Sequence, residues 1–122
     1  MEVEINVLTG YATKSRERSA IEAGANFLFD KSMYHVFLDR VVKQADKVIV
    51  VVDDDDDNLA ANVMFLEDAG DTVHAFSNPL KLLEQIEEIN PDAVLTDWDM
   101  PEMTGLMLVA KLREIFPLES SS

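Results

Sequence analysis

Aspartates directly follow two apolar runs of this sequence. The run 47–52 leads into Asp53 and Asp54, and the run 93–96 leads into Asp97. If both runs are neighbouring parallel strands, the three carboxylates lie together beyond the carboxyl edge of one sheet. Clustered carboxylates repel one another unless a cation neutralises them, and an all-oxygen site suits Mg²⁺. The spacing therefore predicts a site for a divalent cation and a phosphoryl group.

A calcium-binding loop is one alternative use of the same acidic run. Asp53, Asp55 and Asp57 alternate as such a loop requires. However, Asn58 stands at the position of the required glycine, and Met64 stands where the loop needs a glutamate. The sequence therefore disfavours calcium binding. The last three aspartates of the run are instead expected to form a solvated helix start, stabilised by the helix dipole.

A phosphatase of the haloacid dehalogenase type is a second alternative. Asp97 and Asp99 supply the paired aspartates of that family's first motif. However, Pro101 stands where that family has threonine or valine, and a chain of 122 residues leaves no room for a cap domain. Both points argue against this class of enzyme.

The composition favours one compact domain, because 122 residues with 48% apolar side chains can bury one sizeable core. We expect residues 1–122 to form this single domain, with 118–122 as a frayed tail. The sequence contains no cysteine, so oxygen or histidine must hold any metal. His35 and His74 stand apart from carboxylates with ligand spacing and are expected to be ordinary residues.

Charge and hydropathy exclude several kinds of partner. The formal charge of −14 opposes direct binding to nucleic acid or to an anionic membrane. No run approaches the roughly 18 apolar residues that span a bilayer, and the acidic N-terminus is unlike a signal peptide. A cytoplasmic location without a membrane segment is therefore expected.

Short apolar runs alternate with longer segments of helical period, which is typical of an α/β fold with a doubly wound parallel sheet. Five strands are expected, near residues 4–8, 26–29, 47–52, 73–76 and 93–96. Apolar stripes at helical spacing are expected to pack on the sheet. They are Met33, Phe37, Val41 and Ala45; Leu59, Val63 and Leu66; Leu83, Ile86 and Ile89; and Leu108, Leu112 and Ile115. Asn78 before Pro79 predicts a helix start, and Gly70 predicts the end of the preceding helix.

Two segments carry the pattern of a known family. Residues 51–59 hold an acidic pair after a strand, and residues 92–105 hold an aspartate followed by a Met-Pro-x-Met-x-Gly loop. Together they resemble the receiver domain of two-component response regulators, with all three features at the family's spacing. Further parts of the pattern occur in residues 8–12 and 23–31. The resemblance covers essentially the whole chain and implies a five-stranded, flavodoxin-like receiver fold.

The parts of this pattern occur in an unusual order. Residues 1–45 resemble the C-terminal part of a receiver domain, and residues 47–117 resemble its N-terminal part. The chain is therefore expected to be a circularly permuted receiver, joined across residues 44–47 and opened after Pro117. Permutation preserves contacts and changes only which loop is open, so the site is expected to survive.

The permuted order implies a particular sheet. Counted along the chain, the strands are expected in the spatial order fourth, third, fifth, first, second. A helix over residues 33–45 would return on the face that it shares with the helix after Asp54, which makes the crossover right-handed, as required. The switch point of the sheet then falls between the strands that end at Asp54 and Asp97, where open α/β sheets bind ligands.

The resemblance also implies how Mg²⁺ would be held. Asp54 and Asp97 would supply direct oxygen ligands, and the backbone carbonyl of Asp99 would supply a third. Asp53 would contact the metal through a water molecule, or would accept hydrogen bonds from the groups that surround the direct ligands. Water molecules and a phosphoryl oxygen would complete the coordination, as Mg²⁺ commonly requires.

By the same resemblance, Asp97 is the phosphoacceptor, which attacks phosphorus in line and forms an acyl phosphate. Mg²⁺ and the Lys31 ammonium would neutralise the equatorial oxygens, because phosphoryl transfer depends mainly on positioning and charge. The Thr9 hydroxyl and nearby backbone amides would donate hydrogen bonds. Gly10 would leave space for the phosphoryl group.

Two positions depart from the family pattern. Ser32 follows Lys31, where family members usually have proline after a cis bond. We expect a trans bond here, because a cis bond without proline costs roughly 2.5 to 4 kcal/mol. Leu28 stands where family members have a tyrosine or phenylalanine that pairs with the threonine at the position of Thr9. Phe27 or Phe29 would take this role only after a register shift.

The implied function is a signalling switch and not an enzyme. A histidine kinase or phosphotransfer protein would supply the phosphoryl group, and residues 13–45 would form the output face. An engineered permutant or chimera, kept as a scaffold without physiological signalling, is the alternative. The chain is expected to be a monomer or a dimer that exchanges halves between two copies.

Overall fold

The computed structural model describes residues 3–33, 36 and 46–118 of the chain. Within them, five parallel strands form one sheet in the order β2-β1-β5-β3-β4. The strands are β1 (Glu4–Thr9), β2 (Phe27–Asp30), β3 (Val48–Val52), β4 (Thr72–Phe76) and β5 (Ala93–Asp97). Each agrees with its predicted range to within one residue at either end, and the spatial order is the predicted one. The predicted α/β fold with a five-stranded parallel sheet is confirmed.

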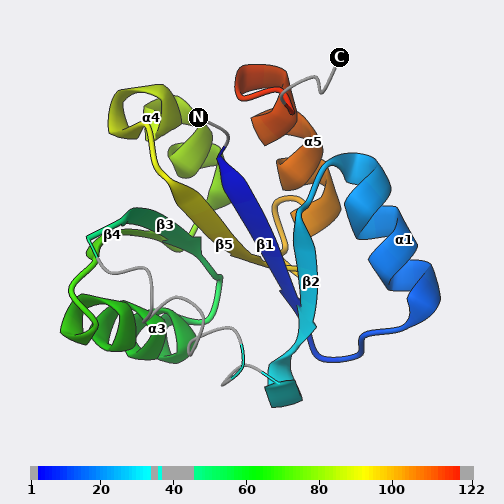
Figure 1. Cartoon of the computed structure of the whole chain (residues 1–122), viewed down its shortest axis with the longest axis horizontal. Helices are drawn as coiled ribbons and strands as arrows, with labels where there is room; N and C mark the ends of the chain where they lie inside the picture. Colours follow the sequence, from blue (N-terminus) through cyan, green and yellow to red (C-terminus); the bar gives the residue numbers. More distant parts are fainter. Residues whose placement is uncertain (1–2, 34–35, 37–45, 119–122) are drawn as a thin grey trace.

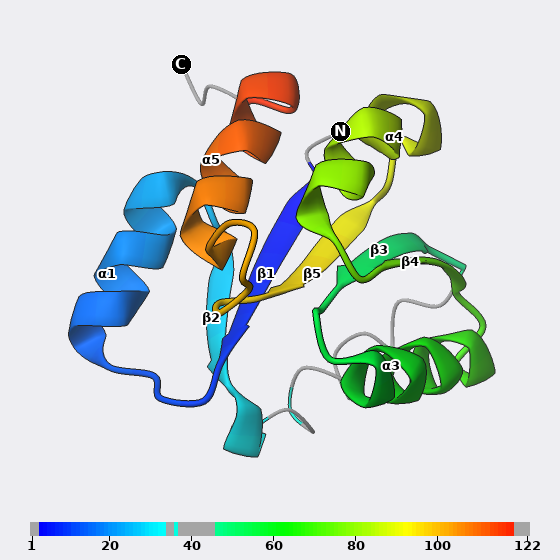
Figure 2. The same cartoon turned by 180° about the vertical axis from the view of Figure 1, so that it is seen from behind.

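Helices lie on both faces of the sheet, as Figure 1 and Figure 2 show. They are α1 (Lys14–Ala23), α3 (Asp56–Asp68), α4 (Pro79–Ile89) and α5 (Gly105–Ile115), with a short 3-10 helix η1 (Lys31–Met33). Successive residues of a strand point to opposite faces. Val50 and Val52 therefore pack with α1, α4 and α5, whereas Ile49 and Val51 pack with α3. Two core clusters on opposite faces make the sheet doubly wound.

Capping residues fix where the helices begin. The side chains of Asp55, Asn78 and Thr104 each accept a hydrogen bond from a backbone N–H in the first turn of α3, α4 and α5, respectively. Pro79 occupies the start of α4, and Gly70 adopts a left-handed φ of 100° just after α3. The predicted helix start at Asn78 and helix end at Gly70 are confirmed, as is the solvated helix start that follows Asp54.

Most of the predicted helix over residues 33–45 lies outside the described residues, as does half of the predicted join across 44–47. Met33 is described, and its side chain is 49% exposed. Its assignment to a buried stripe was wrong, because residues 31–33 form the tight 3-10 turn that follows β2. No helix in the described part of the chain is both long enough and apolar enough to cross a membrane.

One arginine ties together segments that are far apart in the sequence. Arg113 near the end of α5 donates from Nε to the carbonyl of Gly24 at 2.7 Å and from Nη1 to the carbonyl of Val3 at 2.9 Å. It also donates to the carbonyl of Phe116 at 3.2 Å and to Oδ1 of Asn26 at 2.7 Å. A single guanidinium thus joins the start of β1, the loop before β2 and the end of α5, using the planar set of donors that arginine provides.

We expect Arg113→Met to destabilise the fold by about 2 to 3 kcal/mol, because it leaves partly buried carbonyl groups without their charged donor. Urea unfolding should show a lower midpoint with an unchanged slope. Arg18→Met is the matched control, because Arg18 lies exposed on α1. Equal midpoints for the two variants would contradict the role given to Arg113.

Candidate functional site

The predicted site residues lie where three neighbouring strands end. Val52 of β3 pairs with Thr96 of β5, so Asp53 and Asp97 follow at the same level of the sheet. On the other side of β5, Leu8 pairs with Asp97, and Thr9 therefore stands one residue further along β1. The residues lie beside the β3 and β5 pair, beyond the carboxyl edge, where open α/β sheets bind ligands.

Three carboxylates converge at this edge. Asp53, Asp54 and Asp97 each offer one oxygen atom, and these atoms lie within 4.8 Å of one another. Asp53 and Asp97 are only 4% and 7% exposed, whereas Asp54 is exposed. The group offers oxygen donors alone, which are the ligands that Mg²⁺ prefers, and it has one side open to solvent. It could therefore hold a metal ion.

Burial and mutual repulsion set the charge state of this group. Burial raises the pKa of Asp53, and the Asp97 and Asp54 carboxylates raise it further, against the lowering effects of the Asp55 N–H and Lys31. Burial likewise raises the pKa of Asp97, helped by Asp54 and opposed by Lys31 and the Trp98 N–H. Without a cation, the site therefore carries negative charge that its surroundings only partly neutralise.

Lys31 reaches the site from the loop after β2. Its Nζ lies 3.2 Å from Oδ1 of Asp97. The loop is held by Asp30, which accepts hydrogen bonds from the Ser32 N–H at 2.9 Å, the Ser32 hydroxyl at 2.7 Å and the Ala12 N–H at 3.1 Å. These bonds lower the pKa of Asp30. All peptide bonds in the described residues are trans, so the trans bond before Ser32 is confirmed, and the loop still delivers Lys31 to Asp97.

Thr9 is fully buried at the end of β1. Its hydroxyl oxygen accepts hydrogen bonds from Nη1 of Arg16 at 2.7 Å and from the N–H of Tyr11 at 3.2 Å. The guanidinium carbon of Arg16 also lies 5.0 Å from the ring centroid of Trp98. Sequence reasoning missed Arg16, since α1 has only one buried residue and a weak apolar pattern.

Neither aromatic residue of β2 takes the role of the aromatic side chain that the family has at the position of Leu28. Leu28 packs with the core cluster on the α1 face, whereas Phe29 packs with the cluster on the α3 face. The rings of Phe27 and Phe29 are stacked, with centroids 5.9 Å apart. The idea that either ring compensates for Leu28 was wrong, because alternation along the strand directs both to the opposite face.

Gly105 closes the loop that follows β5. Its N–H donates to the carbonyl of Trp98 at 2.7 Å. A Cβ at this position would overlap the carbonyl oxygen of Asp97 and would lie 3.0 Å from the Trp98 Cα. The loop thus packs directly on the backbone of Asp97, which explains the glycine at the end of the Met-Pro-x-Met-x-Gly segment.

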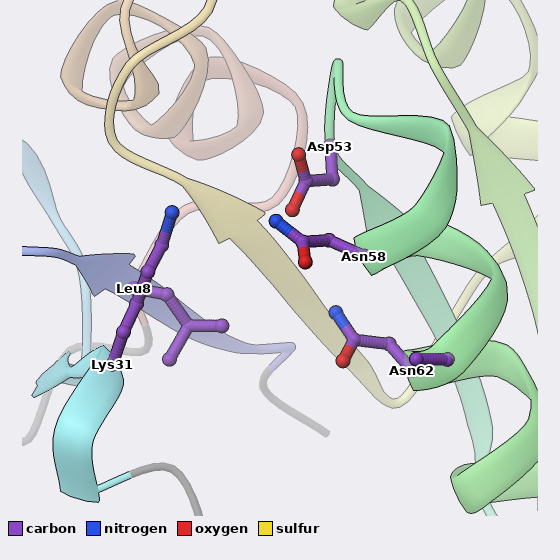
Figure 3. Close-up of a pocket in the computed structure, with 6 residues that line it drawn as sticks. Leu8, Lys31, Asp53, Asn58 and Asn62 are labelled. Carbon is purple, nitrogen blue, oxygen red and sulfur yellow. The ribbon is translucent and has the colours of Figure 1, made fainter.

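Two cavities flank the carboxylates. The first, of about 270 Å³, is lined by Leu8, Lys31, Asp53, Asn58, Ala61 and Asn62. Figure 3 shows the amide side chains of Asn58 and Asn62 and the Asp53 carboxylate pointing toward Lys31 and Leu8 across this cavity. The amides were missed in the sequence, although their spacing of four residues on one helix was the available signal. The second cavity, of about 310 Å³, is lined by Asp54, Asp99, Met100, Pro101 and Thr104.

Comparison with known proteins decides the family. The model of the response regulator receiver domain matches residues 49–118, which is more than half of the chain. The chain belongs to the response regulator receiver domain family. The match begins in β3 and includes the acidic pair, Asp97 and Gly105, whereas β1 and β2 precede it in the sequence.

A curated relative of this receiver domain is protein-glutamate methylesterase/protein-glutamine glutaminase 1 of Albidiferax ferrireducens, which is 32% identical over 82 residues. The alignment covers 67% of this chain and 22% of the relative, so the chain spans about a fifth of that protein's length. No solved structure matches the chain. The family assignment supports a signalling role as a phosphoacceptor.

The structure of the receiver domain thus brings together most of the predicted site. Asp53, Asp54 and Asp97 form one group, and Lys31 contacts it from the β2 side. Thr9 lies at the same edge, with its hydroxyl bonded to Arg16 and Tyr11. The side chain of Asp99 lines a cavity together with Asp54. The coordination by its carbonyl group remains a prediction.

We expect Gly105→Ala to destabilise the receiver domain by about 1 to 3 kcal/mol, because its methyl group would press on backbone that has no free space. Gly10→Ala is the matched control, since a Cβ at Gly10 meets nothing within 4 Å. Thermal unfolding of both variants provides the measurement. A stability loss for Gly10→Ala as large as that for Gly105→Ala would rule out close packing as the cause.

Charge repulsion predicts a pH-dependent effect of Asp53→Asn. The raised pKa means that the folded chain binds the Asp53 proton more tightly than the unfolded chain does. Ionisation of Asp53 therefore destabilises the fold at a pH above the folded-state pKa of this group. The effect disappears as the pH falls to the ordinary aspartate pKa of 3.8. In metal-free buffer, we expect Asp53→Asn to be more stable than the original chain at pH 7, with the difference closing toward acid pH.

Urea midpoints measured from neutral to acid pH test this expectation. Asp57→Asn is the control, because it removes the same charge from an exposed position of the acidic run. A gain in stability that is equal for both variants, or that grows as the pH falls, would speak against repulsion within the buried group.

Proposed function

We propose that this receiver domain is a switch that accepts a phosphoryl group on Asp97 in the presence of Mg²⁺. One observation carries the proposal: the buried Asp97 carboxylate lies between two further carboxylates on one side and the Lys31 ammonium, at 3.2 Å, on the other. A metal ion and an ammonium group placed in this way suit phosphoryl transfer, which depends on positioning and charge neutralisation.

The proposed metal ligands are Asp54 and Asp97 directly, the carbonyl of Asp99, and Asp53 through water. The convergence of the three carboxylates and the cavity shared by Asp54 and Asp99 support this set. When bound, Mg²⁺ would neutralise charge on the acidic group and on the phosphoryl oxygens. The raised pKa values of the two buried aspartates support the need for a cation.

The residues of the chain have distinct proposed roles in the transfer. An Asp97 oxygen forms a new bond to phosphorus while the bond between phosphorus and the donor's nitrogen breaks, and the leaving nitrogen keeps the electron pair and takes up a proton. The Trp98 N–H at 2.9 Å and Lys31 orient the Asp97 carboxylate. Lys31 and the Thr9 hydroxyl then bind oxygens of the transferred group.

We further propose that the chain is a circularly permuted receiver domain. The observed strand order supports this, because counting from β3 converts it into the order 2-1-3-4-5 of flavodoxin-like sheets. The family match, which begins in β3, supports the same conclusion. Receiver domains generally work with histidine kinases or phosphotransfer proteins, and such a protein is the proposed donor here. Residues 13–45 are the proposed output face, of which 13–33 and 36 are described.

Intact mass after incubation with Mg²⁺ and phosphoramidate tests the proposed chemistry. We expect one phosphoryl adduct on the original chain and none on Asp97→Asn. Removal of Mg²⁺ or the change Asp54→Asn, which removes a proposed metal ligand, should reduce adduct formation by about tenfold or more, because the metal that neutralises the phosphoryl oxygens is then absent or weakly held. Asp57→Asn is the control and should react like the original chain.

The other outcomes are equally informative. An adduct that persists in Asp97→Asn would reject Asp97 as the acceptor. A folded chain that binds Mg²⁺ and forms no adduct would reject the switch and favour the scaffold alternative. Size measurement at two concentrations separates a monomer from a dimer that exchanges halves.

A further inference from the structure

Arg16 contacts both segments that frame the acceptor aspartate. Its Nη1 donates to the hydroxyl oxygen of Thr9 at 2.7 Å, and its guanidinium carbon lies 5.0 Å from the ring centroid of Trp98. Trp98 follows Asp97 directly, and its N–H donates both to Oδ1 of Asp97 at 2.9 Å and to the carbonyl of Leu8 at 2.8 Å. One side chain from α1 thus bridges the ends of β1 and β5.

The position of Arg16 is fixed at both ends. Its backbone N–H donates to the side chain of Thr13, the N-cap of α1, at 3.1 Å. Its planar guanidinium lies over the Trp98 ring, an arrangement that a cation and an indole face favour. Arg16 is therefore held at its backbone by Thr13 and at its tip by Trp98 and Thr9.

The hydrogen bonds of Thr9 determine what its hydroxyl can still do. A hydroxyl group has two acceptor lone pairs and one proton to donate. Both acceptor positions are occupied, one by Nη1 of Arg16 and the other by the N–H of Tyr11 at 3.2 Å. Only the proton remains for a new partner. A phosphoryl group has oxygen acceptors and therefore matches this remaining donor.

We infer that Arg16 is a positioning residue for phosphoryl transfer to Asp97, acting through the Thr9 hydroxyl. By filling an acceptor position of Thr9, Arg16 directs the hydroxyl proton toward the phosphoryl oxygens. Its cation–π contact with Trp98 keeps this arrangement in register with the backbone that orients Asp97. The inference rests on the proposed phosphoacceptor function and adds a residue that the sequence motifs do not include.

The test is a double-mutant cycle on the rate of adduct formation, followed by intact mass with Mg²⁺ and phosphoramidate. We expect Arg16→Met to slow the reaction about fivefold to tenfold, which is the effect of losing one charge-assisted hydrogen bond. Thr9→Ala should cause a loss of similar size. Because Arg16 acts through Thr9, the double variant should react no more slowly than Thr9→Ala alone.

Two further variants separate positioning from a general effect of charge or stability. Arg18→Met removes a cation from an exposed position of the same helix and should leave the rate unchanged. Arg16→Lys keeps a cationic donor and should recover part of the rate. If Arg16→Met does not fold, the same cycle is run with Arg16→Gln, which keeps a polar side chain and removes the charge.

A spectroscopic readout reports on the contact itself. Trp98 is the single tryptophan of the chain, so its emission reports on this site alone. Without any phosphodonor, Arg16→Met should change the emission of Trp98, and Arg18→Met should not.

The outcomes distinguish this inference from the proposed function. No adduct on the original chain would overturn both. A normal adduct on the original chain, together with an unchanged rate in Arg16→Met, would overturn only the role of Arg16. Independent, multiplicative losses in the Thr9→Ala and Arg16→Met variants would also overturn it, because they would mean that Arg16 does not act through Thr9.

Discussion

Repulsion among three carboxylates is the constraint on which the rest of this structure depends. Asp53, Asp54 and Asp97 converge because β3 and β5 are adjacent and end at the same level. Burial raises the pKa of two of them, so the folded chain holds these charges at a cost to its own stability. The apolar core on both faces of the sheet has to offset that cost. Folding therefore leaves negative charge at this edge of the sheet that the described residues only partly neutralise.

Much of the fold could be read from the sequence, because β-branched runs that end in aspartate locate the central strands and mark the edge of the sheet where they end. The strand order followed from the resemblance to receiver domains. The bridge from Arg16 to Thr9 could not be predicted, since it depends on where a largely polar helix lies against the sheet. The opposite faces of Leu28 and Phe29 were predictable from alternation alone.

The loop after β2 shows where periodicity misleads. Met33 fits an apolar helical stripe, yet the chain forms a 3-10 turn at residues 31–33. Asp30 stabilises that turn by accepting two hydrogen bonds from Ser32. These local polar contacts stabilise the conformation that places Lys31 beside Asp97. The spacing of apolar residues along the sequence contains no information about them.

The hydrogen bonds of Arg113 have a consequence for attachment. Its guanidinium donates to the carbonyl groups of both Val3 and Phe116. The two ends of the described chain are therefore close enough to be bridged by this one side chain. Figure 1 shows that β1 begins and α5 ends on the same side of the molecule, at the amino edge of the sheet. Asp53 and Asp97 lie at the opposite edge, where β3 and β5 end. A label attached at this edge, near Val3 or Phe116, would therefore lie away from Asp97 and leave the opposite edge of the sheet uncovered.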